Sequence, residues 1–231
     1  MTFARFTLTL AAALALAAQA QVPPSSADQA AYTGLHADAQ RGDALAIARA
    51  TDAPGFAPAE LNARDAHGRT PLHVATFARR RAAVRALIHA GASTAALDQD
   101  RYDAVTIAAV ADDEETLRVL LAEGASAKLT TSRYDGTALI AAAHLGHDGV
   151  VRQLIAAGAP LDHVNNLHWT ALIEAIVLGN GGPRHQAVVR ALLDAGASTQ
   201  LADRDGRRPL QLARAYGYTA IEVLLMAAGA R

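Results

Sequence analysis

The dipeptide Gly-Ala recurs at nearly even intervals along most of this 231-residue chain. Successive glycines are 33, 34, 38 and 33 residues apart, and the five pairs are Gly91-Ala92, Gly124-Ala125, Gly158-Ala159, Gly196-Ala197 and Gly229-Ala230. A fixed period of this length is typical of a protein built by stacking one small structural unit. The chain is therefore expected to be a repeat protein, in which each unit contacts mainly its neighbours.

Each of the first four glycines follows apolar residues spaced i, i+3 and i+4, which form one face of a helix. These residues are Val84, Leu87 and Ile88; Leu117, Leu120 and Leu121; Val151, Leu154 and Ile155; and Val189, Leu192 and Leu193. Glycine closes such a helix at low cost because it tolerates positive φ.

A second helix is expected in each unit. Twenty-one residues before Gly91, Thr70-Pro71-Leu72-His73 combines a good N-cap with a proline suited to the first turn. Ahead of it, Asp65-Ala66-His67-Gly68 has the composition of a turn, so the link between units is expected to project as a tight, hairpin-like finger. Each unit is then two antiparallel helices and a finger.

With these residues the chain resembles the ankyrin repeat proteins, most strongly over Asp65 to Ala92. The resemblance implies an all-α fold, an ankyrin-repeat solenoid of stacked helix-turn-helix units with protruding finger loops. The distance from helix start to glycine is 21 residues in four units and 26 in the fifth, where five residues are inserted within Gly179 to His185. Arg101, Asp135 and His168 stand where Gly68 and Gly206 stand in other fingers.

This pattern divides the chain into a signal peptide, a leader and six repeat units. The predicted boundaries are 1–20 for the signal peptide, 21–30 for a disordered leader, 31–61 for an atypical N-terminal capping repeat, and 62–94, 95–127, 128–161, 162–199 and 200–231 for five ankyrin repeats.

The first twenty residues have the layout of a secretory signal. Arg5 supplies one positive charge, Phe6 to Ala18 is an uncharged apolar run, and Ala18-Gln19-Ala20 places small residues where signal peptidase selects them. A signal of this kind would direct export of the chain to the periplasm or the medium, with cleavage near Ala20, before Gln21. No later stretch is long and apolar enough for a membrane helix, so no membrane insertion is expected after cleavage.

Composition excludes several functions. The chain has no cysteine, which rules out disulfides, thiolate metal sites and cysteine nucleophiles. Its 21 basic and 22 acidic residues give a net charge of -1, which provides no field for gathering nucleic acid. No hydrolase, nucleotide-binding or metalloprotease motif is found, so we expect a protein that is not an enzyme and that takes no cofactor.

In an ankyrin array the finger tips and the exposed start of the inner helix are free to vary. Five of the eight aromatic residues that follow the signal fall there, namely Phe77, Tyr102, Tyr134, Trp169 and Tyr216. Tyrosine, tryptophan and arginine supply much of the energy of protein interfaces. The expected function is a noncatalytic interaction scaffold in the periplasm, a monomer binding another protein. Its expected partner-binding residues are Tyr102, Arg133, Tyr134, His144, Trp169, Arg204, Arg207 and Tyr216.

Two alternatives remain open from the sequence. Histidines 144, 147, 163 and 168 with Glu174 could converge on a metal ion, although the resemblance implies that His73 and His147 have structural hydrogen bonds instead. The chain could also be a self-associating structural protein.

Two further features are interpreted from the sequence. Glu174 is expected to face the groove beside Trp169. The insertion within Gly179 to His185 is interpreted as either a tolerated surface loop or a second contact.

Overall fold

The computed structural model describes residues 21–231, so the expected signal peptide lies outside the described residues. The chain forms two compact units, one of Val22–Ala138 and one formed mainly by Leu139–Arg231. Over residues 21–231 the secondary structure is helical apart from one antiparallel pair of two-residue strands, β1 (Thr130–Thr131) and β2 (Gly136–Thr137). The prediction of an all-α fold is confirmed.

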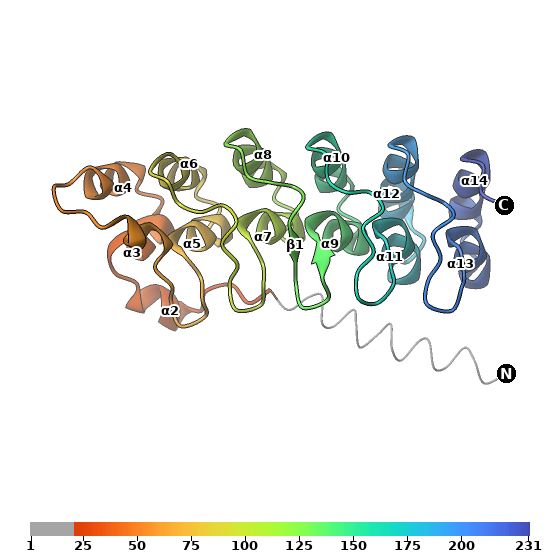
Figure 1. Ribbon diagram of the computed structural model, residues 1–231, viewed down its shortest axis with the longest axis horizontal. Helices are drawn as coiled ribbons and strands as arrows, with labels where there is room; N and C mark the ends of the chain where they lie inside the picture. Colours follow the sequence, from red (N-terminus) through yellow and green to blue (C-terminus); the bar gives the residue numbers. More distant parts are fainter. Residues whose placement is uncertain (1–20) are drawn as a thin grey trace. The chain divides into compact units, whose positions relative to one another are not determined.

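The first unit contains three stacked helix pairs. The pairs are α3 (Gly34–Arg41) with α4 (Ala44–Thr51), α5 (Pro71–Phe77) with α6 (Arg81–His89), and α7 (Ala104–Val110) with α8 (Glu114–Ala122). Inner helices α3, α5 and α7 form one row and outer helices α4, α6 and α8 a second (Figure 1). A 3-10 turn, η1 (Pro58–Asn62), follows the first pair and stands where the later pairs have their Gly-Ala close.

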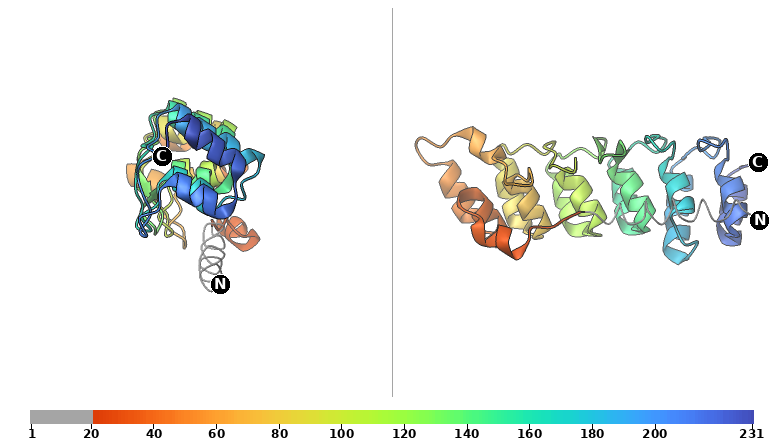
Figure 2. Two further views of the ribbon diagram at one scale, coloured as in Figure 1. Left: turned by 90° about the vertical axis from the view of Figure 1, so that its right-hand side faces the viewer. Right: turned by 90° about the horizontal axis from the view of Figure 1, so that it is seen from below.

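The second unit repeats this arrangement. Its pairs are α9 (Ala138–Leu145) with α10 (Asp148–Ala156), α11 (Ala171–Val177) with α12 (Pro183–Asp194), and α13 (Pro209–Tyr216) with α14 (Thr219–Ala227). Helices α11 and α13 pack on each other, and α12 packs between α10 and α14. Each unit therefore presents finger loops at one end of its inner helices, and the views in Figure 2 show the same layering.

The glycine C-caps are formed as the sequence predicts. Gly91 has φ of 100°, and the N–H of Ala92 donates to the carbonyl of Leu87, which closes α6. Val84 and Leu87, on the predicted apolar face, are fully buried. Burying such side chains is what holds neighbouring repeats together, because a single repeat has no core of its own.

The fingers keep their geometry where glycine is replaced. Arg101, Asp135 and His168 adopt φ of 65°, 52° and 64°, close to the 72° of Gly68. A non-glycine residue there carries the steric cost of the left-handed conformation, and the finger hydrogen bonds described below compensate for it.

The segment before the first pair is ordered, which corrects the expectation of a disordered leader over 21–30. Residues Ser26–Ala31 form helix α2, with a capping box between Ser25 and Asp28. Its prolines and serines are typical of disorder, but Asp28 makes tertiary contacts with a finger, described below, that composition does not reveal. No helix in the described part of the chain has the length and apolarity needed to cross a membrane.

Candidate partner-binding surface

Four of the five fingers are built on one turn of five residues. Its first residue is Asp65, Asp98, Asn165 or Asp203, and the side-chain Oδ1 accepts the N–H groups of the third and fifth residues at 2.8 to 3.0 Å. In the remaining finger, Ser132 Oγ takes the same two N–H groups at 3.2 and 3.4 Å. The side chain of the first residue thus folds the tip locally, and the second residue of every finger is exposed.

Neighbouring fingers of the first unit are tied to each other. The N–H of Gln99 donates to the carbonyl of His67 at 3.1 Å, and the N–H of Ser132 donates to the carbonyl of Arg101 at 2.9 Å. Arg133 reaches back to Asp100 at 2.6 Å. These bonds fix the finger tips before any partner arrives, so binding does not have to order them.

Tyr102 and Tyr134 lie on adjacent fingers in this unit, and each ring is partly exposed. Burial of the rest of the Tyr102 side chain raises the pKa of its hydroxyl. Arg133 and Tyr134 lie near enough to act on this hydroxyl electrostatically. The structure therefore brings together three of the predicted residues, Tyr102, Arg133 and Tyr134, in one patch that combines aromatic surface with hydrogen-bond donors.

Trp169, Arg204 and Arg207 lie on the two fingers of the second unit. Trp169 is half-buried at the fifth position of its finger, equivalent to that of Tyr102. Arg204 donates to the carbonyl of Asn166 at 3.0 Å, and Arg207 pairs with Asp203 and Asp205, each at 2.8 Å. The arginines therefore brace the fingers, and only their remaining donors are available to a partner.

His144 and Tyr216 do not belong to this surface. Each lies in the last turn of its inner helix, α9 or α13, whereas the fingers precede the first turn. His144 is 8% exposed, which corrects the prediction that it contacts a partner. Tyr216 stacks on Tyr218 with ring centroids 5.6 Å apart. The prediction grouped both with the exposed start of the inner helix, whereas Gly146 and Gly217, which end these two helices, follow them within two residues.

Behind Trp169 lies a buried polar network that the sequence did not reveal. Glu174 is 5% exposed, which corrects the expectation that it faces a groove. Its Oε1 accepts from Nδ2 of Asn165 at 2.9 Å, and its Oε2 lies 3.3 Å from Nδ1 of His144. Since Oδ1 of Asn165 also holds the Trp169 turn, Glu174 stabilises the finger from behind.

The five-residue insertion is packed against the fold. Nε2 of His185 lies 2.9 Å from the carbonyl oxygen of His144, which can only accept, so His185 donates there. The hydroxyl of Tyr218 donates to the carbonyl of Gly179 at 2.9 Å. The insertion is thus a structural part of the second unit.

The histidines do not assemble a metal site. Among the described residues, no three His, Cys, Asp or Glu side chains are grouped so that they could hold an ion. His144 is paired with Glu174, and Nε2 of His73 lies 3.0 Å from the carbonyl of Ala96 while its Nδ1 accepts the N–H of Thr70, as the resemblance implied. The metal-binding alternative therefore loses its ligand set in this part of the chain.

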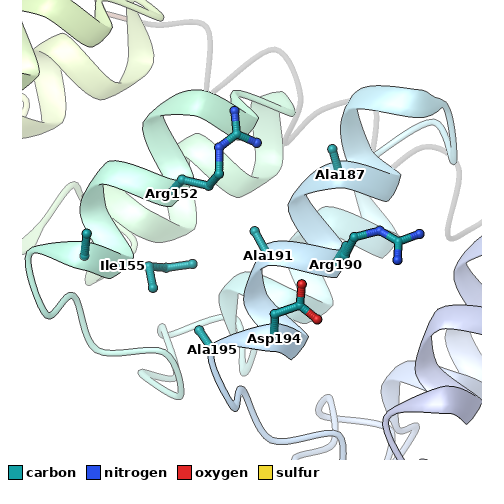
Figure 3. Close-up of a pocket in the computed structure, with 8 residues that line it drawn as sticks. Arg152, Ile155, Ala187, Arg190, Ala191, Asp194 and Ala195 are labelled. Carbon is teal, nitrogen blue, oxygen red and sulfur yellow. The ribbon is translucent and has the colours of Figure 1, made fainter.

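A shallow groove of about 470 Å³ lies on the outer helices of the second unit, between α10 and α12 (Figure 3). Ile155 and Ala191 face each other across it, and the remaining lining is three alanines and three charged residues, namely Ala156, Ala187, Ala195, Arg152, Arg190 and Asp194. Arg152, at one rim, is paired with Asp148. The groove therefore combines a small apolar floor with the charged side chains of Arg152, Arg190 and Asp194.

Comparison with known proteins agrees with this architecture. A family profile described as "Ankyrin repeats (3 copies)" matches residues 105–203, and one described as "Ankyrin repeat" matches residues 67–99. The chain is 38% identical over 172 residues to a putative ankyrin repeat protein, YahD, of Escherichia coli K12, which covers 74% of this chain and 85% of that protein.

Solved structures are similar as well. An ankyrin repeat domain from Acinetobacter baumannii AYE is 46% identical with a TM-score of 0.78, covering 85% of this chain and 98% of that one. The ankyrin repeat domain of Bcl-3 is 28% identical with a TM-score of 0.77, covering 87% and 88%. The helix pairs, the fingers and these matches together show that the chain belongs to the ankyrin repeat family.

Proposed function

We propose that this protein is a noncatalytic scaffold that binds another protein through its finger tips after export to the periplasm. Ankyrin repeats in general mediate protein–protein interaction, and the coarse function follows from the family. The observation that carries the finer proposal is the position of Tyr102, Tyr134 and Trp169 on fingers whose backbone is already hydrogen-bonded. Rigid aromatic anchors lose little entropy on association.

Site-specific crosslinking tests whether the finger tips form the binding surface. A photoreactive residue in place of exposed Arg204, on a finger, should capture a partner protein in the native compartment, whereas the same residue in place of exposed Arg118, on outer helix α8, should not. The captured partner would be identified by mass spectrometry and its affinity measured with purified proteins. Equal capture at both positions would contradict the assignment of the finger surface.

The location is tested separately. Mass spectrometry of the purified mature protein should find Gln21 as the first residue, and a fusion of residues 1–30 to an enzyme that is active only after export should be active. Light scattering at two concentrations distinguishes a monomeric scaffold from a self-associating structural protein. A mass that rises with concentration would favour the latter.

A further inference from the structure

The first and last fingers carry arginine at the same fifth position, but the two side chains differ greatly in exposure. Arg69 pairs through Nε with Oδ2 of Asp65 at 2.7 Å, and Arg207 pairs through Nε with Oδ2 of Asp203 at 2.9 Å. The Arg69 side chain is 2% exposed, whereas that of Arg207 is 41% exposed. Something other than the finger itself buries Arg69.

The side-chain contacts that Arg69 makes outside its own finger come from residues 22–32, which we call the strap. Oδ2 of Asp28 accepts from Arg69 at 3.1 Å, the carbonyl of Val22 lies 3.4 Å from the same guanidinium, and the hydroxyl of Tyr32 donates to Asp65 at 2.8 Å. Figures 1 and 2 show α2 beside the first finger, with the chain before it continuing past α5 toward α7. The strap thus covers the start of the finger surface.

The third finger position explains why a second carboxylate comes from the strap. In the last finger this position is Asp205, which pairs with Arg207 at 2.8 Å. In the first finger the same position is His67, which has no carboxylate. Asp28 of the strap supplies the second carboxylate to Arg69 instead. A guanidinium has five N–H donors, so Arg69 keeps two nitrogens available once Asp65 is bound.

The strap is attached by these polar contacts, by the burial of Pro24, and by the stacking of Tyr32 on His36 with ring centroids 5.4 Å apart. Helix α2 buries none of its own residues, and six residues are too few to be helical in isolation. The carboxylate of Asp28 accepts the N–H of Ser25 as well as the guanidinium of Arg69. These hydrogen bonds favour its charged form and lower its pKa to about 2. Pro24 is the one buried residue of the strap, and the helix pairs pack mainly on one another rather than on α2, so the strap can leave while the repeats stay stacked.

We propose that the first finger, through Arg69 and His67, is a binding site for an acidic partner segment, and that the strap fills it until a partner displaces it. The ligand is a protein segment whose helical first turn has the form Ser-x-x-Asp, because that is the chemistry the site binds in this structure. This inference deepens the proposed function, since it names the partner's chemistry at one end of the finger surface.

The test uses the full-length mature chain and a fluorescein-labelled peptide with the sequence of residues 22–33, followed by fluorescence anisotropy. Asp28→Asn combined with Tyr32→Phe weakens the two side-chain contacts of the strap, so this variant should bind the peptide at least tenfold more tightly than the wild type. The same peptide with asparagine in place of its aspartate should lose binding to the variant. Asp38→Asn, which removes the pairing of Asp38 with Arg41 on α3, serves as the control and should behave as the wild type.

Two measurements keep the test decisive. Hydrogen exchange of the amides in 26–31 should be faster in the double variant, and circular dichroism should be unchanged. Equal peptide affinity for wild type and variant, or affinity indifferent to the peptide's aspartate, would overturn the proposal. A wild-type dimer that dissociates in the double variant would also overturn it, in favour of a strap exchanged between two copies.

Failure here is distinguishable from failure of the proposed function. Loss of finger crosslinking at Arg204 with intact peptide binding would contradict only the scaffold surface. Finger crosslinking without peptide binding would contradict only the site at Arg69.

Discussion

Oε2 of Glu174 lies 3.3 Å from Nδ1 of His144, and both side chains are almost fully buried. A carboxylate with so little solvent depends on its partners, which are the imidazole and the side-chain amide of Asn165. Because Asn165 holds the turn that carries Trp169, this buried contact couples the stability of the second unit to the geometry of a finger.

Glu174→Ala should therefore be strongly destabilising. Removing the carboxylate leaves the Asn165 amide and His144 buried without their acceptor, and we expect a loss of about 2 to 4 kcal/mol in the free energy of unfolding. Urea denaturation followed by circular dichroism measures it. Glu174→Gln, which keeps an acceptor for Asn165, is the matched control and should lose much less; equal losses would show that the network contributes nothing specific.

Stability should depend on pH through His73. Burial lowers the pKa of His73 to about 4, and its Nδ1 already accepts the N–H of Thr70. The unfolded chain, with an ordinary histidine pKa, then binds the proton more readily than the folded chain does. Stability is complete above about pH 6.5 and falls as the pH drops toward 4, by about 3 kcal/mol in all.

Unfolding measured between pH 7 and pH 4 tests this dependence. His73→Asn should be less stable at pH 7 but should lose less stability on acidification than the wild type. His168→Asn removes an exposed histidine at a position whose positive φ asparagine tolerates, and it serves as the matched control. The same pH profile in all three proteins would assign the effect to other groups.

The positions of the finger turns along the chain could be predicted from sequence, but the burial and contacts of individual side chains could not. Asp65 and Gly68 predict a turn because its backbone conformation depends only on neighbouring residues. The repeat spacing then located the turns that contain Arg101, Asp135 and His168. The burial of His144 depends on Glu174 and on His185 from the insertion, and the burial of Arg69 depends on Asp28, 41 residues earlier. Such contacts have no periodic signature, so pattern reasoning assigned His144 to the surface and 21–30 to a disordered leader.

Gly181 should be far less replaceable than Gly124. Both have positive φ, 67° and 88°, but a Cβ on Gly181 would stand 2.5 Å from the Tyr218 ring, whereas one on Gly124 would meet nothing within 4 Å. Gly124→Ala should cost about 1 to 2 kcal/mol for its backbone conformation. Gly181→Ala adds displacement of the ring, for about 2 to 4 kcal/mol in total. Thermal unfolding compares the two, and equal costs would show that the insertion does not depend on Tyr218.

Trp169→Ala should weaken partner binding while leaving the fold intact. The ring is half-buried, its backbone N–H holds the finger turn without help from the side chain, and truncating an aromatic anchor typically costs about 2 kcal/mol or more of binding free energy. Titration with the crosslinked partner gives the affinity, and circular dichroism checks the helices. Leu45→Ala, at an exposed apolar position on α4, is the control; a comparable loss there would contradict the importance of the fingers.

The turn that builds each finger also separates what folds the chain from what it recognises. The first residue of the turn supplies the acceptor, and the fourth supplies the left-handed backbone. The fifth residue contributes only its backbone N–H, so its side chain, which is Tyr102 or Trp169 in two of the fingers, is not needed for the turn. Exchanging side chains at this position would change what the fingers contact while the turn stays intact, so selectivity can evolve here without a compensating change in the repeats.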